Sequence, residues 1–154
     1  MAERGQRKYT IEKATWRDLL ALSALEQACF GPDAWPLIEL MGVLTFPGVV
    51  RYRALGEGNL VGFVAGDPRT KDNAGWILTL AVDENWRRMG IAQDLMARCE
   101  ERLHMPRMKL TVRRGNSAAI RLYEKLGYEQ VDIWTKYYRN GEDGLVFSKE
   151  MAWV

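Results

Sequence analysis

The chain has 154 residues, 47% of them hydrophobic, and its 22 basic and 20 acidic residues leave a formal net charge of +2 at pH 7. This length and apolar content fit a single domain, residues 1–154, that can bury a core. The basic residues are scattered and form no block, which argues against nucleic acid or a bulk membrane surface as a partner.

In its first half the chain alternates strand-like runs with runs whose apolar residues recur at helical spacing. Thr15 is expected to cap the first helix, and Pro36 lies where a second should begin. A glycine-rich connection at 56–59 joins two apolar runs and predicts a hairpin. The expected elements are a strand at 8–14, helices at 15–30 and 36–44, strands at 49–55 and 60–67, a loop at 68–73 and a buried strand at 75–82.

The second half continues this alternation. A helix of roughly 13 residues should start at Ile91, because apolar residues recur there every four positions. Gly127 is expected at the left-handed C-cap of a later helix. The further elements are a strand at 108–116, a helix at 117–126 and a hairpin of strands at 128–138 and 145–151. Their order predicts an α/β fold with a mixed sheet. Along the first of these strands Met108, Leu110 and Val112 should face one way.

Residues 85–96, NWRRMGIAQDLM, place arginines and a glycine at the start of a helix. Amides in a first helical turn have no internal partner, and the helix dipole adds positive charge there. Gly90 and Ala92 would let a diphosphate approach the amides of residues 88–93, while Arg87 and Arg88 add charge. The alternative is that Gly90 only makes the turn and the arginines are solvated. The two commonest phosphate-loop motifs are absent, which favours another phosphate carrier.

Residues 78–96 and 110–128 together resemble the GNAT superfamily of N-acetyltransferases. The superfamily's acetyl-CoA signature, Q/R-x-x-G-x-G/A, is matched by Arg87, Gly90 and Ala92. Its N-x-x-A-x-x-L-Y-E-K-L-G-F/Y segment is matched by Asn116, Ala119, Leu122, Tyr123, Gly127 and Tyr128. The closing residues 137–151 also look like the branch that acetylates the N-terminal alanine of ribosomal proteins.

The resemblance implies a single domain with a mixed, mostly antiparallel sheet, flanking helices and splayed central strands. It also implies acetyl-CoA as cosubstrate and Tyr123 as the acid that protonates the leaving sulfur. The implied cofactor-binding residues are Leu80, Ala81, Val82, Arg87, Arg88, Met89, Gly90, Ile91, Ala92, Gln93 and Asn116. From the residues alone, Asn116 most simply caps a helix, Tyr123 packs as a half-buried aromatic residue, and Leu80 to Val82 form a buried strand.

At the position of the family's general base this chain has a different residue. The ribosomal-protein branch has a glutamate on the strand L-E-V-R, and this chain has Thr111 there. Asp132, Glu150 or a water chain are the remaining candidates. Without a strong base the site suits an α-amine, about a quarter unprotonated at pH 7.4, better than a lysine amine, about 0.1% unprotonated. We therefore expect a peptide N-terminus or a small amine of modest basicity as acceptor.

Two other functions stay open: acetylation of a small-molecule amine, and a CoA-binding sensor that has lost catalysis. Trp134, Tyr137 and Tyr138 would shape the acceptor groove, pack on the sheet or form the edge of a homodimer. Cys29 and Cys99 are expected to be structural, and no metal site is expected. With no signal-peptide pattern at 1–13 and no apolar run near the roughly 20 residues of a membrane span, we expect a cytoplasmic protein.

Overall fold

The computed structural model describes residues 7–153, and its contacts group into two compact units. The first unit comprises residues 7–67 and 78–103, and the second comprises 68–77 and 104–153. Residues 1–6 lie outside the described residues. They are the first part of the segment 1–13, in which the sequence shows no signal-peptide pattern. Among the described helices none is both long and apolar enough to cross a membrane. The expectation of a single domain stays a prediction.

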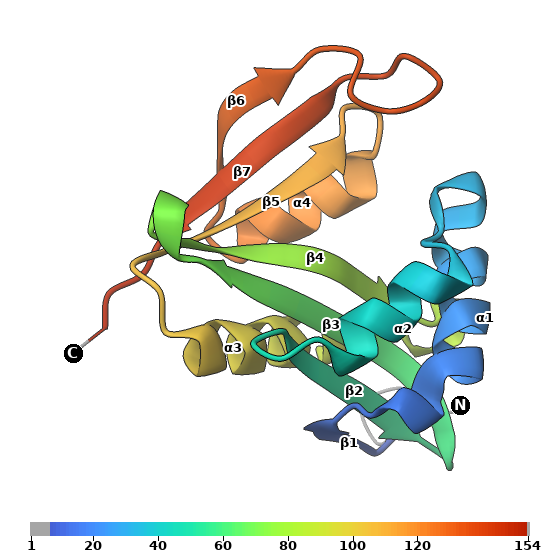
Figure 1. Cartoon of the computed structure of the whole chain (residues 1–154). Helices are drawn as coiled ribbons and strands as arrows, with labels where there is room; N and C mark the ends of the chain where they lie inside the picture. The colour runs from blue at the N-terminus through green and yellow to red at the C-terminus, as the bar shows by residue number, and fades with distance from the viewer. Residues whose placement is uncertain (1–6, 154) are drawn as a thin grey trace. The chain divides into compact units, whose positions relative to one another are not determined.

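Strands and helices follow one another along the chain in the order that the sequence predicts (Figure 1). In chain order the strands are β1 (Tyr9–Lys13), β2 (Val50–Gly56), β3 (Asn59–Arg69), β4 (Ala74–Val82), β5 (Arg107–Arg113), β6 (Glu129–Trp134) and β7 (Gly144–Glu150). The helices are α1 (Leu19–Phe30), α2 (Leu37–Thr45), α3 (Ile91–Leu103) and α4 (Ser117–Lys125), with short 3-10 turns η2 (Trp16–Asp18), η3 (Gly31–Asp33), η4 (Thr70–Asp72) and η5 (Glu84–Trp86).

The strands form a seven-stranded sheet in the order β1-β2-β3-β4-β5-β7-β6. The ladders β1–β2, β2–β3, β5–β7 and β6–β7 are antiparallel, whereas β4 and β5 run parallel. The parallel ladder has the rows Gly75–Met108 and Trp76–Lys109, both in the first part of β4, so pairing between these central strands is partial. The expected mixed, mostly antiparallel sheet is confirmed.

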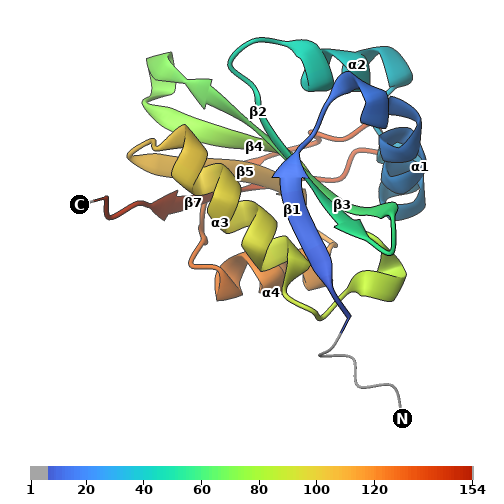
Figure 2. The same ribbon diagram turned by 90° about the horizontal axis from the view of Figure 1, so that it is seen from below.

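The core of the first unit lies between α1, α2 and one face of β3 and β4. Phe63 and Ala65 of β3 and Ala81 of β4 belong to it, together with leucines of both helices. Helix α3 covers the opposite face: a Cβ on Gly62 would lie 2.9 Å from a methyl of Ile91, and strand residues alternate between faces. Figure 2 shows α3 running beside β1 on that face. The packing fixes where α3 begins.

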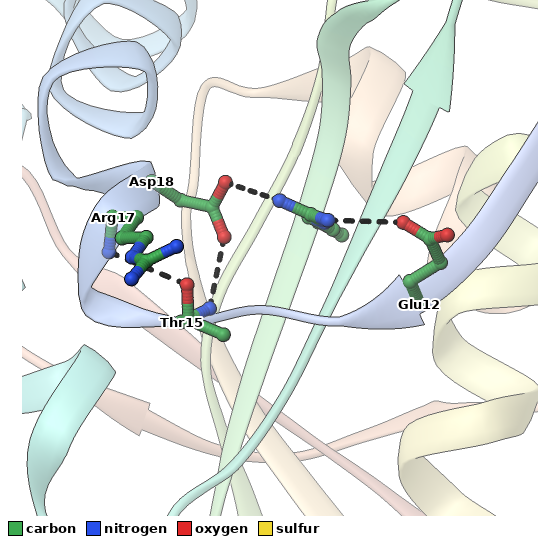
Figure 3. A network of polar contacts seen from close by, with 5 residues as sticks. Glu12, Thr15, Arg17 and Asp18 are labelled. Carbon is green, nitrogen blue, oxygen red and sulfur yellow. Dashed lines mark hydrogen bonds and ion pairs between the residues drawn. The ribbon is translucent and has the colours of Figure 1, made fainter.

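A polar network anchors the start of α1 to β1 and β2 (Figure 3). Thr15 caps η2 as expected, in a capping box with Asp18. The Arg53 guanidinium donates to Asp18 at 2.7 Å and to Glu12 at 3.0 Å. Asp18 is buried, so the charge of Arg53 compensates its desolvation.

In the second unit, β5 alternates as predicted. Met108, Leu110 and Val112 are buried, while Lys109, Thr111 and Arg113 on the other face are half-buried. The rows Lys109–Ser148, Thr111–Val146 and Arg113–Gly144 join that face to β7. Helix α4 lies beside β5 and β7 (Figure 1).

Three element boundaries differ from the prediction. The strand expected at 108–116 ends at Arg113, because the Asn116 N–H turns back to the Arg113 carbonyl at 3.0 Å. The strand expected at 128–138 ends at Trp134, because a turn closed by the Tyr138 N–H on the Glu142 carbonyl follows. The loop expected at 68–73 is instead the end of β3 followed by η4.

Candidate functional site

The connection from β4 to α3 is held firmly in place. Asp83 accepts from the Asn85 N–H at 2.8 Å and so starts η5. Trp86 is buried and lies against Gly56, where an added Cβ would come within 2.4 Å of its ring. The guanidinium of Arg7 covers the same ring at 3.6 Å. The loop that follows therefore starts from a fixed point.

Residues 88–90 approach α3 in a conformation that few residues adopt. Arg88 has φ +64° and Gly90 has φ +88°. A Cβ on Gly90 would meet nothing closer than the Tyr9 hydroxyl oxygen at 3.8 Å, so conformation and not crowding calls for glycine. Tyr9 itself donates a hydrogen bond to Asp94 in the first turn of α3.

Gly90 immediately precedes α3 and has no side chain with which to cap it. The first helical bond runs from the Asp94 N–H to the Gly90 carbonyl at 2.9 Å. The amides of Ile91, Ala92 and Gln93 precede this bond and have no intrahelical acceptor. Such an end, approached over a glycine, fits a phosphate group. We call residues 87–93 the cradle.

The two arginines of the cradle have different surroundings. Arg87 donates from Nε to the Val82 carbonyl at 3.2 Å, and its Nη2 lies 3.9 Å from Cys29 Sγ. It therefore ties the cradle to β4. Arg88 is exposed and extends the positive character of the helix end.

Leu80 to Val82 form the end of β4 in the first unit, beside the cradle in the chain. Ala81 is buried, and Leu80 and Val82 are half-buried. The Val82 carbonyl accepts from Arg87 and from the Cys29 thiol at 3.4 Å. Burial raises the pKa of the Cys29 thiol, and raises that of Cys99 to about 12. Both cysteines are thus free thiols of low reactivity.

Asn116 and Tyr123 belong to the second unit, at the start and near the end of α4. Asn116 caps the helix, since its Oδ1 accepts from the Ala119 N–H at 3.1 Å. The simplest interpretation from sequence is therefore confirmed. Because the cap uses only the oxygen, the side-chain amide nitrogen keeps its donors for another acceptor.

Tyr123 is half-buried and meets Tyr128 edge-on, with 6.1 Å between ring centroids. Burial, with a smaller contribution from Tyr138, raises the pKa of Tyr123 to about 12. The phenol is therefore protonated at neutral pH, so it can donate a proton but cannot act as a base.

The acidic residues of the second unit that could stand in for the missing glutamate are engaged by other groups. Thr111 and Tyr137 both lie against Gly144, since a Cβ on that glycine would come within 2.9 Å of the Thr111 methyl group and 3.1 Å of the Tyr137 ring. The carboxylates are held as follows: Glu142 by Arg113, Asp143 by Arg114, Glu150 by Arg107 at the far end of β5, and Asp132 by the Ile133 N–H.

Aromatic side chains gather next to Thr111 in the second unit. Trp76 stacks on Trp134 at 5.7 Å, Trp134 meets Tyr137 at 5.2 Å, and Tyr137 meets Tyr138 at 5.0 Å. From the sequence, Trp134, Tyr137 and Tyr138 are candidates for the acceptor groove, whereas Trp76 is expected only as part of a buried strand. Within residues 7–153, no group of three or more His, Cys, Asp or Glu side chains is arranged to hold a metal ion.

Sequence reasoning also missed Glu26, a fully buried carboxylate on the inner face of α1. It accepts a hydrogen bond from Thr79 of β4 at 2.8 Å. The signal available was an acidic residue within the apolar pattern of that helix, beside Leu22, Leu25 and Cys29.

Comparison with known proteins gives a consistent picture. Residues 16–128 match the model of the acetyltransferase (GNAT) family. The chain is 34% identical over 148 residues to the N-terminal acetyltransferase A complex catalytic subunit NAA10 of Arabidopsis thaliana, covering 92% of this chain and 77% of that protein. It is 32% identical over 103 residues to the L-amino acid N-acetyltransferase AaaT of Escherichia coli, covering 62% and 64%. The solved ribosomal-protein-S18-alanine N-acetyltransferase of Escherichia coli shares the fold, with a TM-score of 0.84, 23% identity and 96% of each chain covered.

Proposed function

The chain belongs to the acetyltransferase (GNAT) family, and within it we propose that this protein acetylates the α-amino group of a peptide or protein N-terminus. Membership makes it an acetyl-CoA-dependent N-acetyltransferase; the acceptor and the roles of single residues are the proposal. One observation carries the acceptor class: the Arabidopsis thaliana relative, whose name assigns it to N-termini, aligns with 92% of this chain.

We assign the pyrophosphate of acetyl-CoA to the cradle. The open amides of Ile91 to Gln93 and the positive φ of Gly90 fit an anionic diphosphate. The main chain of Leu80 to Val82 is assigned to the pantetheine and thioester, and the Asn116 side-chain amide nitrogen to the pantetheine arm. When bound, acetyl-CoA supplies an acetyl group already activated as a thioester.

The transfer itself needs proton handling and positioning. The amine nitrogen bonds to the acetyl carbon, the carbon–sulfur bond breaks, the nitrogen loses a proton and the sulfur gains one. We assign the second proton to the Tyr123 hydroxyl, which is protonated at neutral pH. Holding both reactants in one site supplies much of the rate, so no covalent enzyme intermediate is required.

The acidic residues near Thr111 support an α-amine acceptor. Since Glu142 and Asp143 are held by arginines, neither is free to deprotonate a lysine ammonium. An α-amine, with a pKa near 7.8, is already unprotonated in part at neutral pH. A free amino acid carries the same α-amine, so the partial likeness to AaaT supports small α-amines as the second candidate.

The test is release of the CoA thiol from acetyl-CoA with matched acceptors. One peptide would carry a free N-terminus and no lysine, and the other a blocked N-terminus and one internal lysine; free amino acids and polyamines complete the panel. We expect turnover with the free N-terminus at least about tenfold faster than with the lysine peptide. Faster lysine acetylation would overturn the proposal, and turnover with amino acids alone would favour the second candidate.

The cytoplasmic location and the absence of nucleic-acid and membrane partners stay predictions. Whether the chain forms a homodimer stays open. The CoA-sensor alternative would require tight acetyl-CoA binding with no thiol release across the whole panel.

A further inference from the structure

Glu26 is a carboxylate placed where an apolar side chain would ordinarily pack. None of its surface is exposed (0%), and it lies between Leu25 and Cys29 on the inner face of α1. Its Oε2 accepts from the Thr79 hydroxyl at 2.8 Å, while Oε1 has no hydrogen-bond partner among the described residues. Burial raises the pKa of Glu26, and the Thr79 hydroxyl and the Trp35 N–H oppose that rise.

Stability alone does not account for this residue. Burying a carboxylate with one oxygen unsatisfied costs free energy, and apolar residues of similar size usually replace buried charges at no loss of stability. Besides its interaction with the Trp35 N–H, what Glu26 adds beyond packing is a directed contact between α1 and Thr79 of β4.

That contact lies next to the main-chain segment assigned to the thioester. Thr79 immediately precedes Leu80, and at the other end of the segment the Val82 carbonyl accepts from Cys29 and Arg87. Glu26 and Cys29 are three residues apart on α1 and therefore share a helix face. One helix thus fixes both ends of the segment from Leu80 to Val82.

We propose that Glu26 is a positioning residue for acetyl transfer, which holds the main chain of Leu80 to Val82 through the Thr79 hydroxyl. This rests on the assignment of that segment to the thioester under the proposed function. A displacement near 1 Å at a reacting centre can cost about 10²-fold in rate, so a single buried hydrogen bond can matter far more for turnover than for folding.

Four variants test this: Thr79→Val, which keeps the shape and removes the hydroxyl; Thr79→Ser, which keeps the hydroxyl; Glu26→Leu; and the Glu26→Leu/Thr79→Val pair. We expect kcat at least about tenfold lower for Thr79→Val and Glu26→Leu, and close to the parent for Thr79→Ser. The pair should be no slower than the slower single variant, because both remove one interaction. Parent-like turnover in Thr79→Val, or losses that multiply in the pair, would overturn the inference.

A readout independent of turnover separates this inference from the proposed function. Amide hydrogen exchange at Leu80 to Val82 should be faster in Thr79→Val than in Thr79→Ser. Asp18→Asn is the control. It removes a different buried carboxylate of the same unit, so amide exchange at Leu80 to Val82 should stay at the parent rate. Unchanged exchange at Leu80 to Val82 sinks the role of Glu26 even if the enzyme is active. A parent that acetylates no amine sinks the proposed function even if exchange responds.

Discussion

At the scale of single residues, the proposed chemistry rests on the Tyr123 hydroxyl. Replacing Tyr123 with Phe keeps the ring against Tyr128 and removes the proton. We expect kcat to fall by about 10²-fold or more, with the Kd for acetyl-CoA nearly unchanged, because the proposed role of the phenol is to protonate the leaving sulfur and not to bind the cofactor. Steady-state kinetics and equilibrium binding measure the two quantities.

Tyr52→Phe is the matched control, because it also removes a phenol hydroxyl from a buried ring. It should leave kcat close to the parent value. An equal loss in both variants would mean that the effect of Tyr123→Phe is structural and that another group protonates the sulfur.

At the scale of elements, the start of α3 is where sequence reasoning succeeded most fully. Helix α3 begins at Ile91 and runs for 13 residues, as its apolar spacing predicts. The glycine before it adopts a positive φ, which a residue without a side chain allows at this turn into the helix. The boundaries that failed, at Arg113 and Trp134, are set by short turns, one closed by the Asn116 N–H on the Arg113 carbonyl and the other by the Tyr138 N–H on the Glu142 carbonyl.

Gly90→Ala tests the cradle as an element feature. Alanine at φ +88° strains the main chain by roughly 1–2 kcal/mol, so the turn should relax and redirect the amides of residues 91–93. We expect the Kd for CoA to rise at least about tenfold, measured by calorimetry. Gly58→Ala is matched to it, with φ +79° and open space around the new Cβ, and should leave the Kd unchanged. Equal effects on the Kd for CoA in both variants would overturn the assignment of the pyrophosphate to the cradle.

At the scale of the whole molecule, what the sequence could reveal differs between the parts of the site. The start of α3 at Ile91 and the cap at Asn116 follow from local rules for helices, so they could be predicted. The burial of Glu26 against Thr79 and the position of Trp76 beside Trp134 depend on contacts between residues far apart in the chain. No spacing within a helix or strand encodes those contacts.

The same long-range burial predicts how the folded protein responds to alkaline pH. The pKa values of Tyr9 and Tyr123 are raised from 10.0 to about 12, chiefly by burial, and that of Cys99 from 9.0 to about 12. Folding then favours the protonated forms, so the stabilisation is fully present below pH 9 and is lost as pH rises from 9 for Cys99, and from 10 for the tyrosines, towards 12.

The free energy of unfolding in urea, measured at pH 8, 9, 10 and 11, should therefore decline most steeply above pH 10. Tyr9→Phe and Tyr123→Phe should each reduce the slope of the free energy of unfolding against pH, by an amount that corresponds to at most about one bound proton per molecule. The lysines titrate alike in parent and variant, so their contribution cancels in the difference. A parent and a Tyr123→Phe variant with parallel curves from pH 9 to 11 would show that the environment of this phenol does not favour its protonated form.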